Sequence, residues 1–144
     1  MSRTVDANVL LYASDAASPH HATALDTVEA LARGPEIAYL FWPTVMAYLR
    51  VATHPAVFAR PLSLAEAMGN VDGLLARPHV RTAGEGEAFW LRFRELAVDA
   101  RPTGNLVPDA HLAALMLEQG VGTIVTHDRD FRRFRGFAVE DPFA

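Results

Sequence analysis

The hydrophobic positions of the chain follow two patterns. Short apolar or β-branched runs have the length of buried strands, and longer stretches between them repeat apolar residues at helical spacing, as Ala22, Leu25, Val28 and Leu31 do. The short runs predict strands over residues 4–6, 37–41, 79–82, 123–126 and 137–140. The longer stretches predict helices over residues 8–13, 18–33, 43–53, 63–77, 85–100 and 108–120.

Strands and helices therefore alternate along the chain. This alternation predicts an α/β fold, with a central parallel sheet of about five strands and helices on both of its faces. No linker, internal repeat or low-complexity stretch interrupts the pattern, so we expect one domain over residues 1–144. In a sheet of this kind, functional sites form at the carboxyl ends of the strands.

Composition narrows the chemistry further. The 144 residues include no cysteine, and all 13 basic residues are arginine, against 17 acidic residues for a net charge of −4. A GC-rich coding bias explains the missing lysine well. Whatever the cause, the protein has no Schiff-base or P-loop lysine, no thiol nucleophile, no disulfide and no cysteine zinc site.

The chain also shows no sign of a membrane segment. No apolar run approaches the roughly 20 residues that a membrane-spanning helix needs. The first residues lead directly into a predicted strand, which leaves no room for a signal peptide. We expect a cytoplasmic protein that does not contact membranes.

Four aspartates fall where the predicted fold would gather them. Asp6 ends the first strand, Asp128 and Asp130 follow the strand over 123–126, and Asp109 lies in the first turn of a helix. Carboxylates gathered at strand ends repel one another unless a cation neutralises them, and hard oxygen ligands suit Mg²⁺, with Mn²⁺ as a substitute. Taken singly, Asp109 is equally explained as an acid favoured by the helix dipole, and Asp128 as a turn residue.

Neighbouring polar residues have two interpretations each. Asn8 and Thr126 are placed to hydrogen-bond the carboxylates, but a helix cap and an ordinary strand residue explain them equally well. His20 and His21 follow Pro19 at a helix start, where they are placed either to approach the acids or to form an exposed helix cap, and we expect the cap.

The motifs that carry these residues resemble the PIN-domain family, and within it the VapC-type toxins. The resemblance rests on Val5-Asp6-Ala7-Asn8-Val9-Leu10-Leu11, Leu49-Arg50-Val51-Ala52-Thr53-His54-Pro55-Ala56-Val57-Phe58, Leu106-Val107-Pro108-Asp109-Ala110-His111-Leu112 and Thr126-His127-Asp128-Arg129-Asp130-Phe131, and it covers nearly the whole chain. It implies a Mg²⁺-dependent endoribonuclease toxin that is usually a homodimer and is held silent by a small VapB-like antitoxin. On family analogy, the helices near residues 42–53 and 63–76 are candidate antitoxin or dimer contacts.

The resemblance also assigns roles to the aspartates. Asp6, Asp109 and Asp128 match the acidic positions of the family, and Asp130 matches an acid often found beside them. We expect Asp6 and Asp109 to bind Mg²⁺ directly, while Asp128 completes the metal site or orients the attacking water. Asn8 and Thr126 would support these carboxylates.

One position departs from the family pattern. Such toxins usually carry a glutamate where this chain has Ala47, and residues 37–65 contain no acidic residue that could replace it. A natural subgroup that uses only aspartates, a degenerate enzyme, and a toxin disabled on purpose all remain open explanations. The alternative function is therefore an inactive PIN domain that acts as a binding module for RNA or its antitoxin.

Arginines are the only residues available to grip RNA phosphates. Arg129, Arg132, Arg133 and Arg135 are clustered beside Asp128, and Arg50 follows the helix that flanks the predicted site. Guanidinium groups bind phosphate through two parallel hydrogen bonds, so we expect Arg50, Arg129, Arg132 and Arg133 to contact RNA. A solvated, charge-balanced loop is the competing interpretation.

Overall fold

The computed structural model describes residues 1–144. Its elements, in chain order, are β1 (Ser2–Val5), α1 (Ala7–Ser14), α2 (His21–Arg33), β2 (Ile37–Phe41), α3 (Trp42–Ala52), α4 (Leu64–Leu75), β3 (Val80–Ala83), α5 (Phe89–Ala100), α6 (Leu106–Gln119), β4 (Thr123–Val125), the 3₁₀ helix η1 (Arg129–Arg133) and β5 (Ala138–Glu140). All five predicted strands and all six predicted helices are present. No helix combines the length and the apolar character needed to cross a membrane.

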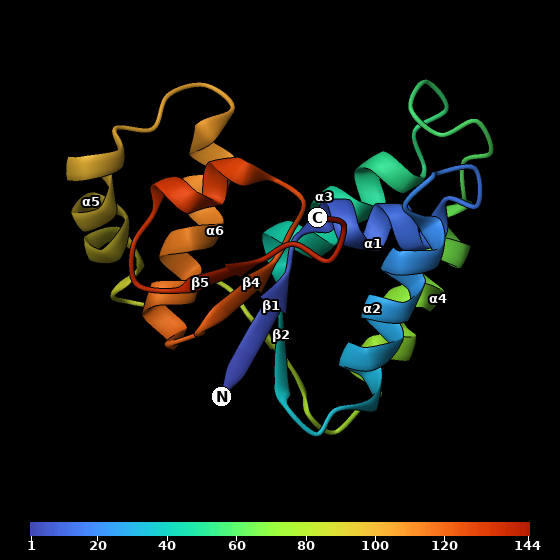
Figure 1. Ribbon diagram of the computed structural model, residues 1–144, viewed down its shortest axis with the longest axis horizontal. Helices are drawn as coiled ribbons and strands as arrows, with labels where there is room; N and C mark the ends of the chain where they lie inside the picture. Colours follow the sequence, from blue (N-terminus) through green and yellow to red (C-terminus); the bar gives the residue numbers. More distant parts are fainter.

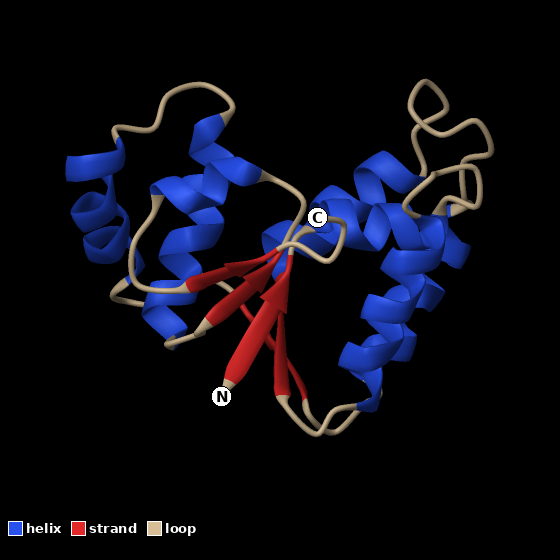
Figure 2. Cartoon of the chain, in the orientation of Figure 1, coloured by secondary structure: helices blue, strands red, loops and turns tan.

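The five strands, drawn red in Figure 2, form one sheet, and their order is β3-β2-β1-β4-β5. Every neighbouring pair is parallel, which confirms the α/β fold expected from the alternating pattern. Helices α5 and α6 lie on one side of the sheet and α1 to α4 on the other, as Figure 1 shows.

Neighbouring residues on the central strands supply the two cores. Leu40 and Val125 pack into the core formed with α1 to α4, whereas Phe41 and Ile124 pack into the core formed with α6. Successive side chains of a strand point to opposite faces of the sheet. A continuous apolar run is therefore what a strand covered on both faces requires.

The strand order reverses beside β1. The chain proceeds outward from β1 to β2 and β3, and then returns to place β4 on the other side of β1. Such a reversal leaves a crevice at the carboxyl ends of the two central strands. Asp6 follows β1 and Asp128 follows β4 after a short connection, so both acids lie at this crevice.

Three local predictions are wrong in detail. Helix α2 begins at His21 and not at residue 18, and α5 begins at Phe89 and not at residue 85. The start of α5 is set by tertiary contacts, because the Glu118 carboxylate of α6 accepts hydrogen bonds from the N–H groups of Gly86 and Ala88. The predicted loop after β4 contains the 3₁₀ helix η1.

Candidate active site at the carboxyl edge of the sheet

Three of the four predicted acids form a tight group. One carboxylate oxygen from each of Asp109, Asp128 and Asp130 lies within 4.8 Å of the others. Asp109 comes from the first turn of α6, while Asp128 caps η1 by accepting a hydrogen bond of 2.9 Å from the N–H of Asp130. Asp128 is therefore both a turn residue and a member of the acidic group, so its two interpretations are compatible.

Asp6 lies beside this group and is held by its own protein contacts. One of its oxygens accepts a 2.7 Å hydrogen bond from the N–H of Ala7, which makes Asp6 the N-cap of α1. The other accepts a 2.9 Å hydrogen bond from the Thr126 hydroxyl. These two contacts fix the orientation of the carboxylate, and each oxygen keeps a further lone pair. Asp6, Asp109, Asp128 and Asp130 are called the acidic edge below.

Thr126 connects the two central strands at the acidic edge. Its side chain is buried, and its hydroxyl donates to Asp6 while accepting a 3.0 Å hydrogen bond from the N–H of Asp128. The Asn8 amide lies 3.4 Å from the same hydroxyl, while the Asn8 side-chain carbonyl oxygen is buried without a partner. Thr126 therefore contacts the acidic edge directly, as one of its two sequence interpretations expects, whereas Asn8 reaches the edge only through the Thr126 hydroxyl.

The protein environment raises the pKa of two of the acids, Asp109 and Asp6. Burial first, and then the negative charges of Asp128, Asp6 and Asp130, raise the pKa of Asp109 to about 7. Burial also raises the pKa of Asp6, against the opposing effect of its hydrogen bonds from Thr126 and Ala7. Both shifts mean that additional negative charge at this edge is unfavourable unless a cation accompanies it.

The donor set fits a hard divalent cation. Converging carboxylate oxygens, with no cysteine or histidine among them, are the ligands that Mg²⁺ and Mn²⁺ prefer. A bound cation would remove the charge repulsion that raises the pKa of Asp109, and the unpartnered oxygen of Asn8 offers an acceptor for a bound water. Asp109, Asp128, Asp130 and the adjacent Asp6 are the residues available to hold it.

The predicted RNA-binding arginines are exposed and lie on two elements. Arg129, Arg132 and Arg133 belong to η1, directly after Asp128, and Arg50 lies in the last turn of α3. Arg133 is 3.6 Å from Asp130, whereas no ion pair engages Arg129 or Arg50. The η1 arginines thus present positive charge next to the acids.

Ala47 is half-buried in α3, on the helix that starts from the carboxyl end of β2. Because β2 is parallel to β1, this helix begins at the same edge of the sheet as Asp6. No acid lies on α3, so the acidic residues of the edge come from the junction of β1 and α1, from α6 and from the segment after β4.

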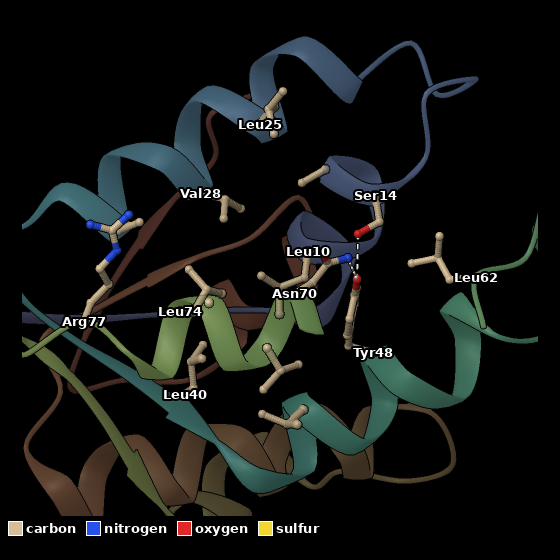
Figure 3. A pocket seen from close by; sticks show the side chains of 15 residues that line it. Leu10, Ser14, Leu25, Val28, Leu40, Tyr48, Leu62, Asn70, Leu74 and Arg77 are labelled. Carbon is tan, nitrogen blue, oxygen red and sulfur yellow. Dashed lines mark hydrogen bonds between the residues drawn. The ribbon is translucent and has the colours of Figure 1, made fainter. Parts of the chain in front are cut away.

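A groove lies among α1, α2, α3 and α4, and two of these helices, α3 and α4, correspond to the helices near residues 42–53 and 63–76 named above as candidate antitoxin or dimer contacts. It encloses about 350 Å³ and is lined mainly by apolar side chains. Tyr48 is buried at its floor, where the phenol hydroxyl lies 2.7 Å from the Ser14 hydroxyl and 3.0 Å from the Asn70 amide (Figure 3). We call this surface the helical groove. Most of its lining comes from four helices, and Leu40 of β2, Leu62 and Arg77 complete it, so no single sequence pattern could have revealed the whole groove.

The expected exposed capping role of His20 is wrong. His20 occupies the N-cap position of α2 but makes no side-chain capping hydrogen bond. Its half-buried ring instead packs against Tyr12, His127 and Phe143. His21 is also engaged, because one of its ring nitrogens lies 3.0 Å from the Tyr12 carbonyl oxygen.

Known proteins share both the sequence and the fold. The family model for the PIN domain matches residues 4–136. Ribonuclease VapC48 of Mycobacterium tuberculosis is 48% identical over 144 residues, which are 100% of this chain and 99% of the relative. The chain is also similar to VapBC2 from Rickettsia felis, solved bound to a promoter DNA fragment, with a TM-score of 0.70, 16% identity and 98% of each chain covered.

A second solved structure has the same fold. VapC20 of Mycobacterium tuberculosis, a toxin that cleaves the sarcin-ricin loop, matches with a TM-score of 0.66 and 15% identity, covering 90% of this chain and 92% of that one. The match to the PIN family model covers residues 4–136, and the alignment with VapC48 covers 100% of this chain. The chain therefore belongs to the PIN domain family, as a protein of the VapC type.

Proposed function

We propose that this protein is a Mg²⁺-dependent endoribonuclease toxin that a VapB-like antitoxin neutralises. The observation that carries the proposal is the convergence of Asp109, Asp128 and Asp130 within 4.8 Å at the point where the strand order reverses. The 48% identity to a protein named a ribonuclease supports the reaction class. Relatives named VapBC support the antitoxin partner.

Each acid has a defined part in the proposed reaction. Asp6, Asp109 and Asp128 would hold Mg²⁺, with Mn²⁺ as a substitute, and Asp130 would add negative charge beside them. Mg²⁺, when bound, supplies the acidity that activates a water and neutralises charge developing on the phosphoryl oxygens. Thr126 keeps the Asp6 carboxylate in one orientation, and the unpartnered Asn8 side-chain oxygen is available to accept a hydrogen bond from a water.

The arginines provide the grip on RNA in this proposal. Arg129, Arg132 and Arg133 lie on η1 directly after Asp128, so phosphates bound there would be adjacent to the acids. Arg50 would contact a phosphate of the RNA further along the strand. RNA binding should therefore weaken as salt rises, because each phosphate contact releases a counterion. A binding constant that does not depend on salt would remove these arginines from the interface.

Substitution of Asp6 tests the reaction. Asp6→Asn should abolish Mg²⁺-dependent cleavage of RNA, whereas Asp26→Asn, an exposed aspartate of α2, should leave it unchanged. Because water attacks in this scheme, and not a neighbouring 2′-hydroxyl, the products should carry 5′-phosphate and 3′-hydroxyl ends. Full activity of Asp6→Asn, or products with cyclic phosphate ends, would rule the scheme out.

A second candidate function rests on Ala47, which lies where related toxins carry a glutamate. In that case the chain is an inactive PIN domain that binds RNA or its antitoxin without cleaving RNA. Calorimetry with Mg²⁺ separates the two, because three or more carboxylates plus waters should still bind the ion in an active enzyme. Binding of RNA without binding of Mg²⁺ or Mn²⁺ would favour the inactive module.

For the antitoxin we propose the helical groove as the docking surface. Its apolar lining suits the apolar face of a helix, which is a common mode of peptide recognition in grooves. Arg77 lies at the groove and offers a partner for an acidic side chain (Figure 3). The groove lies on the opposite face of the sheet from α5 and α6, so this partner would cover a surface distinct from the η1 arginines.

Two matched substitutions test the docking surface. Leu25 lines the groove and is 39% exposed, so Leu25→Arg should weaken antitoxin binding without unfolding the chain. Met68 is 48% exposed on α4 and does not line the groove, so Met68→Arg serves as the control. Equal affinity of both variants for the antitoxin would place the partner elsewhere.

We also propose that the protein is a cytoplasmic homodimer. Trp42 and Trp90 are 42% and 62% exposed, so both rings are available to contact a second copy of the chain. A mass measurement in solution tests the dimer, and a monomer mass at micromolar concentration would contradict it. An RNA substrate supports the cytoplasmic location, which fractionation of expressing cells tests.

A further inference from the structure

Four rings meet just outside the acidic edge. His127, between Thr126 and Asp128, packs against His20 at a centroid distance of 4.9 Å and against Phe143 at 5.2 Å. Phe143 also contacts His20 at 4.8 Å and Tyr12 of α1 at 5.4 Å. The cluster therefore joins α1, the start of α2, the segment after β4 and the segment after β5.

Asp141 fixes the His127 ring within this cluster. Its two carboxylate oxygens lie 3.0 and 3.2 Å from the Nδ1 atom of His127. One of them also accepts a 2.9 Å hydrogen bond from the N–H of Phe143, which sets the turn that places the Phe143 ring. The Asp141 side chain is only 12% exposed. Packing of the rings alone does not require a carboxylate, so the contacts of Asp141 with both His127 and Phe143 point to an orienting role.

The backbone links the His127 ring to the acids. The N–H of Thr126 donates to the carbonyl of Glu140 at 3.0 Å, so the segments after β4 and β5 run together. Asp128 has an extended backbone conformation, and successive side chains of an extended chain point to opposite sides. Thr126 and Asp128 accordingly face Asp6 and Asp109, while His127 faces Asp141 and Phe143.

We propose that Asp141 and Phe143 are positioning residues for the active site, which hold His127 and thereby place the Asp128 carboxylate. The inference rests on the proposed function, since it assigns Asp128 to the metal site. Residues behind metal ligands commonly orient them, and their loss typically lowers metal affinity about 10- to 100-fold. Asp141 acts here one residue away from the ligand, through the backbone of the segment after β4.

Three variants and one control test the inference. Asp141→Ala removes the hydrogen bonds to His127 and to the N–H of Phe143. Phe143→Ala removes the ring contacts and leaves the Asp141 carboxylate in place. Asp141→Asn keeps an acceptor for Phe143 and one hydrogen bond to His127, so it should retain most of the wild-type behaviour. Asp15→Asn is the control, because Asp15 caps the N–H of Ala17 in a comparable turn and contacts none of the four rings.

The first measurement needs neither metal nor RNA. In wild-type protein the N–H groups of Asp128 and Asp130 are hydrogen-bonded to Thr126 and Asp128. Hydrogen exchange at these two amides should become at least about tenfold faster in Asp141→Ala and Phe143→Ala, while amides of α6 and the control variant keep wild-type rates. Unchanged exchange at Asp128 and Asp130 in both alanine variants would overturn the inference.

The second measurement connects the positioning to the site. Calorimetry with Mn²⁺ should show about tenfold weaker binding in Asp141→Ala and Phe143→Ala, with recovery in Asp141→Asn. For RNA cleavage, kcat should fall in both alanine variants, and KM should stay unchanged in Phe143→Ala, which leaves the negative charge of Asp141 beside Arg132 in place. Wild-type protein that neither binds Mn²⁺ nor cleaves RNA contradicts the proposed function alone, since the exchange result still decides the positioning role. Equal Mn²⁺ affinity and kcat in wild type and both alanine variants would overturn the link to the site.

Discussion

The acidic edge and the helical groove are built in opposite ways. The acids come from chain positions directly after strands or at the start of a helix, where the backbone direction places them. The groove comes from side faces of four helices, with Tyr48 hydrogen-bonded to Ser14 and Asn70 at its floor. The edge gathers like charges that oppose folding, whereas the groove is walled by apolar core residues that favour it. This difference separates substitutions that affect chemistry from those that affect stability and partner binding.

The largest expected effect is on catalysis. Asp109→Asn should lower Mg²⁺-dependent RNA cleavage by about 100-fold or more, because it removes one of the converging carboxylates. Antitoxin affinity should stay at the wild-type level, since Asp109 does not line the groove. An RNA cleavage assay and an antitoxin binding assay on the same variant check the two expectations. A variant that loses both properties would show that the two regions are not independent.

Adding an acidic side chain to the acidic edge should increase its affinity for a divalent metal ion. Ala47→Glu should tighten Mn²⁺ binding by about tenfold, comparable to the effect of other groups that support a metal site, and raise the cleavage rate. Calorimetry and RNA cleavage measure the two effects. Unchanged metal affinity would indicate that the aspartates already form the complete site and that the family glutamate has no equivalent here.

The pH dependence of stability provides a third comparison. In the metal-free protein, the pKa of Asp109 is raised from its ordinary value of 3.8 to about 7. Between about pH 4 and pH 7 the folded state holds a proton that the unfolded chain has lost, so the free energy of unfolding should fall as pH rises through this window. The raised pKa of Asp6 acts in the same direction.

Thermal melts of wild type and Asp109→Asn across this window measure the effect. The variant should show a smaller decrease in Tm with rising pH and a higher Tm at pH 8. Saturating Mg²⁺ should raise the Tm of wild type at pH 8, because the ion binds only the folded site. If Tm depends on pH in the same way in wild type and variant, the raised pKa of Asp109 is not the cause of the dependence.

The smallest expected effect concerns the floor of the groove. Tyr48→Phe removes the hydroxyl that contacts Ser14 and Asn70, and should lower the free energy of unfolding by about 1 kcal/mol. Cleavage of RNA should be unaffected. Chemical denaturation and a cleavage assay check the prediction. A loss of cleavage at unchanged stability would mean that the groove and the acidic edge communicate.

The sequence predicted the acids better than it predicted their grouping. Asp6, Asp109, Asp128 and Asp130 were all identified from their places after strands or at a helix start. The structure brings the last three into the tightest group, while the oxygens of Asp6 are engaged by Thr126 and Ala7. Local sequence shows where a carboxylate enters the edge. It does not show which neighbouring donor the side chain meets there.

The fold class follows from the sequence alone, because alternating strand and helix patterns allow few arrangements other than a covered parallel sheet. The places of Asp6, Asp109, Asp128 and Asp130 after strands or at a helix start also follow from the sequence, because each depends only on neighbouring residues. Only the tertiary structure decided the strand order, the groove, and the contact of Asp141 with His127, since these join residues that are distant along the chain. Helix faces and ring contacts depend on how elements pack. The periodicity of apolar residues within one element does not indicate which other element packs against it, so these contacts are visible only in the tertiary structure.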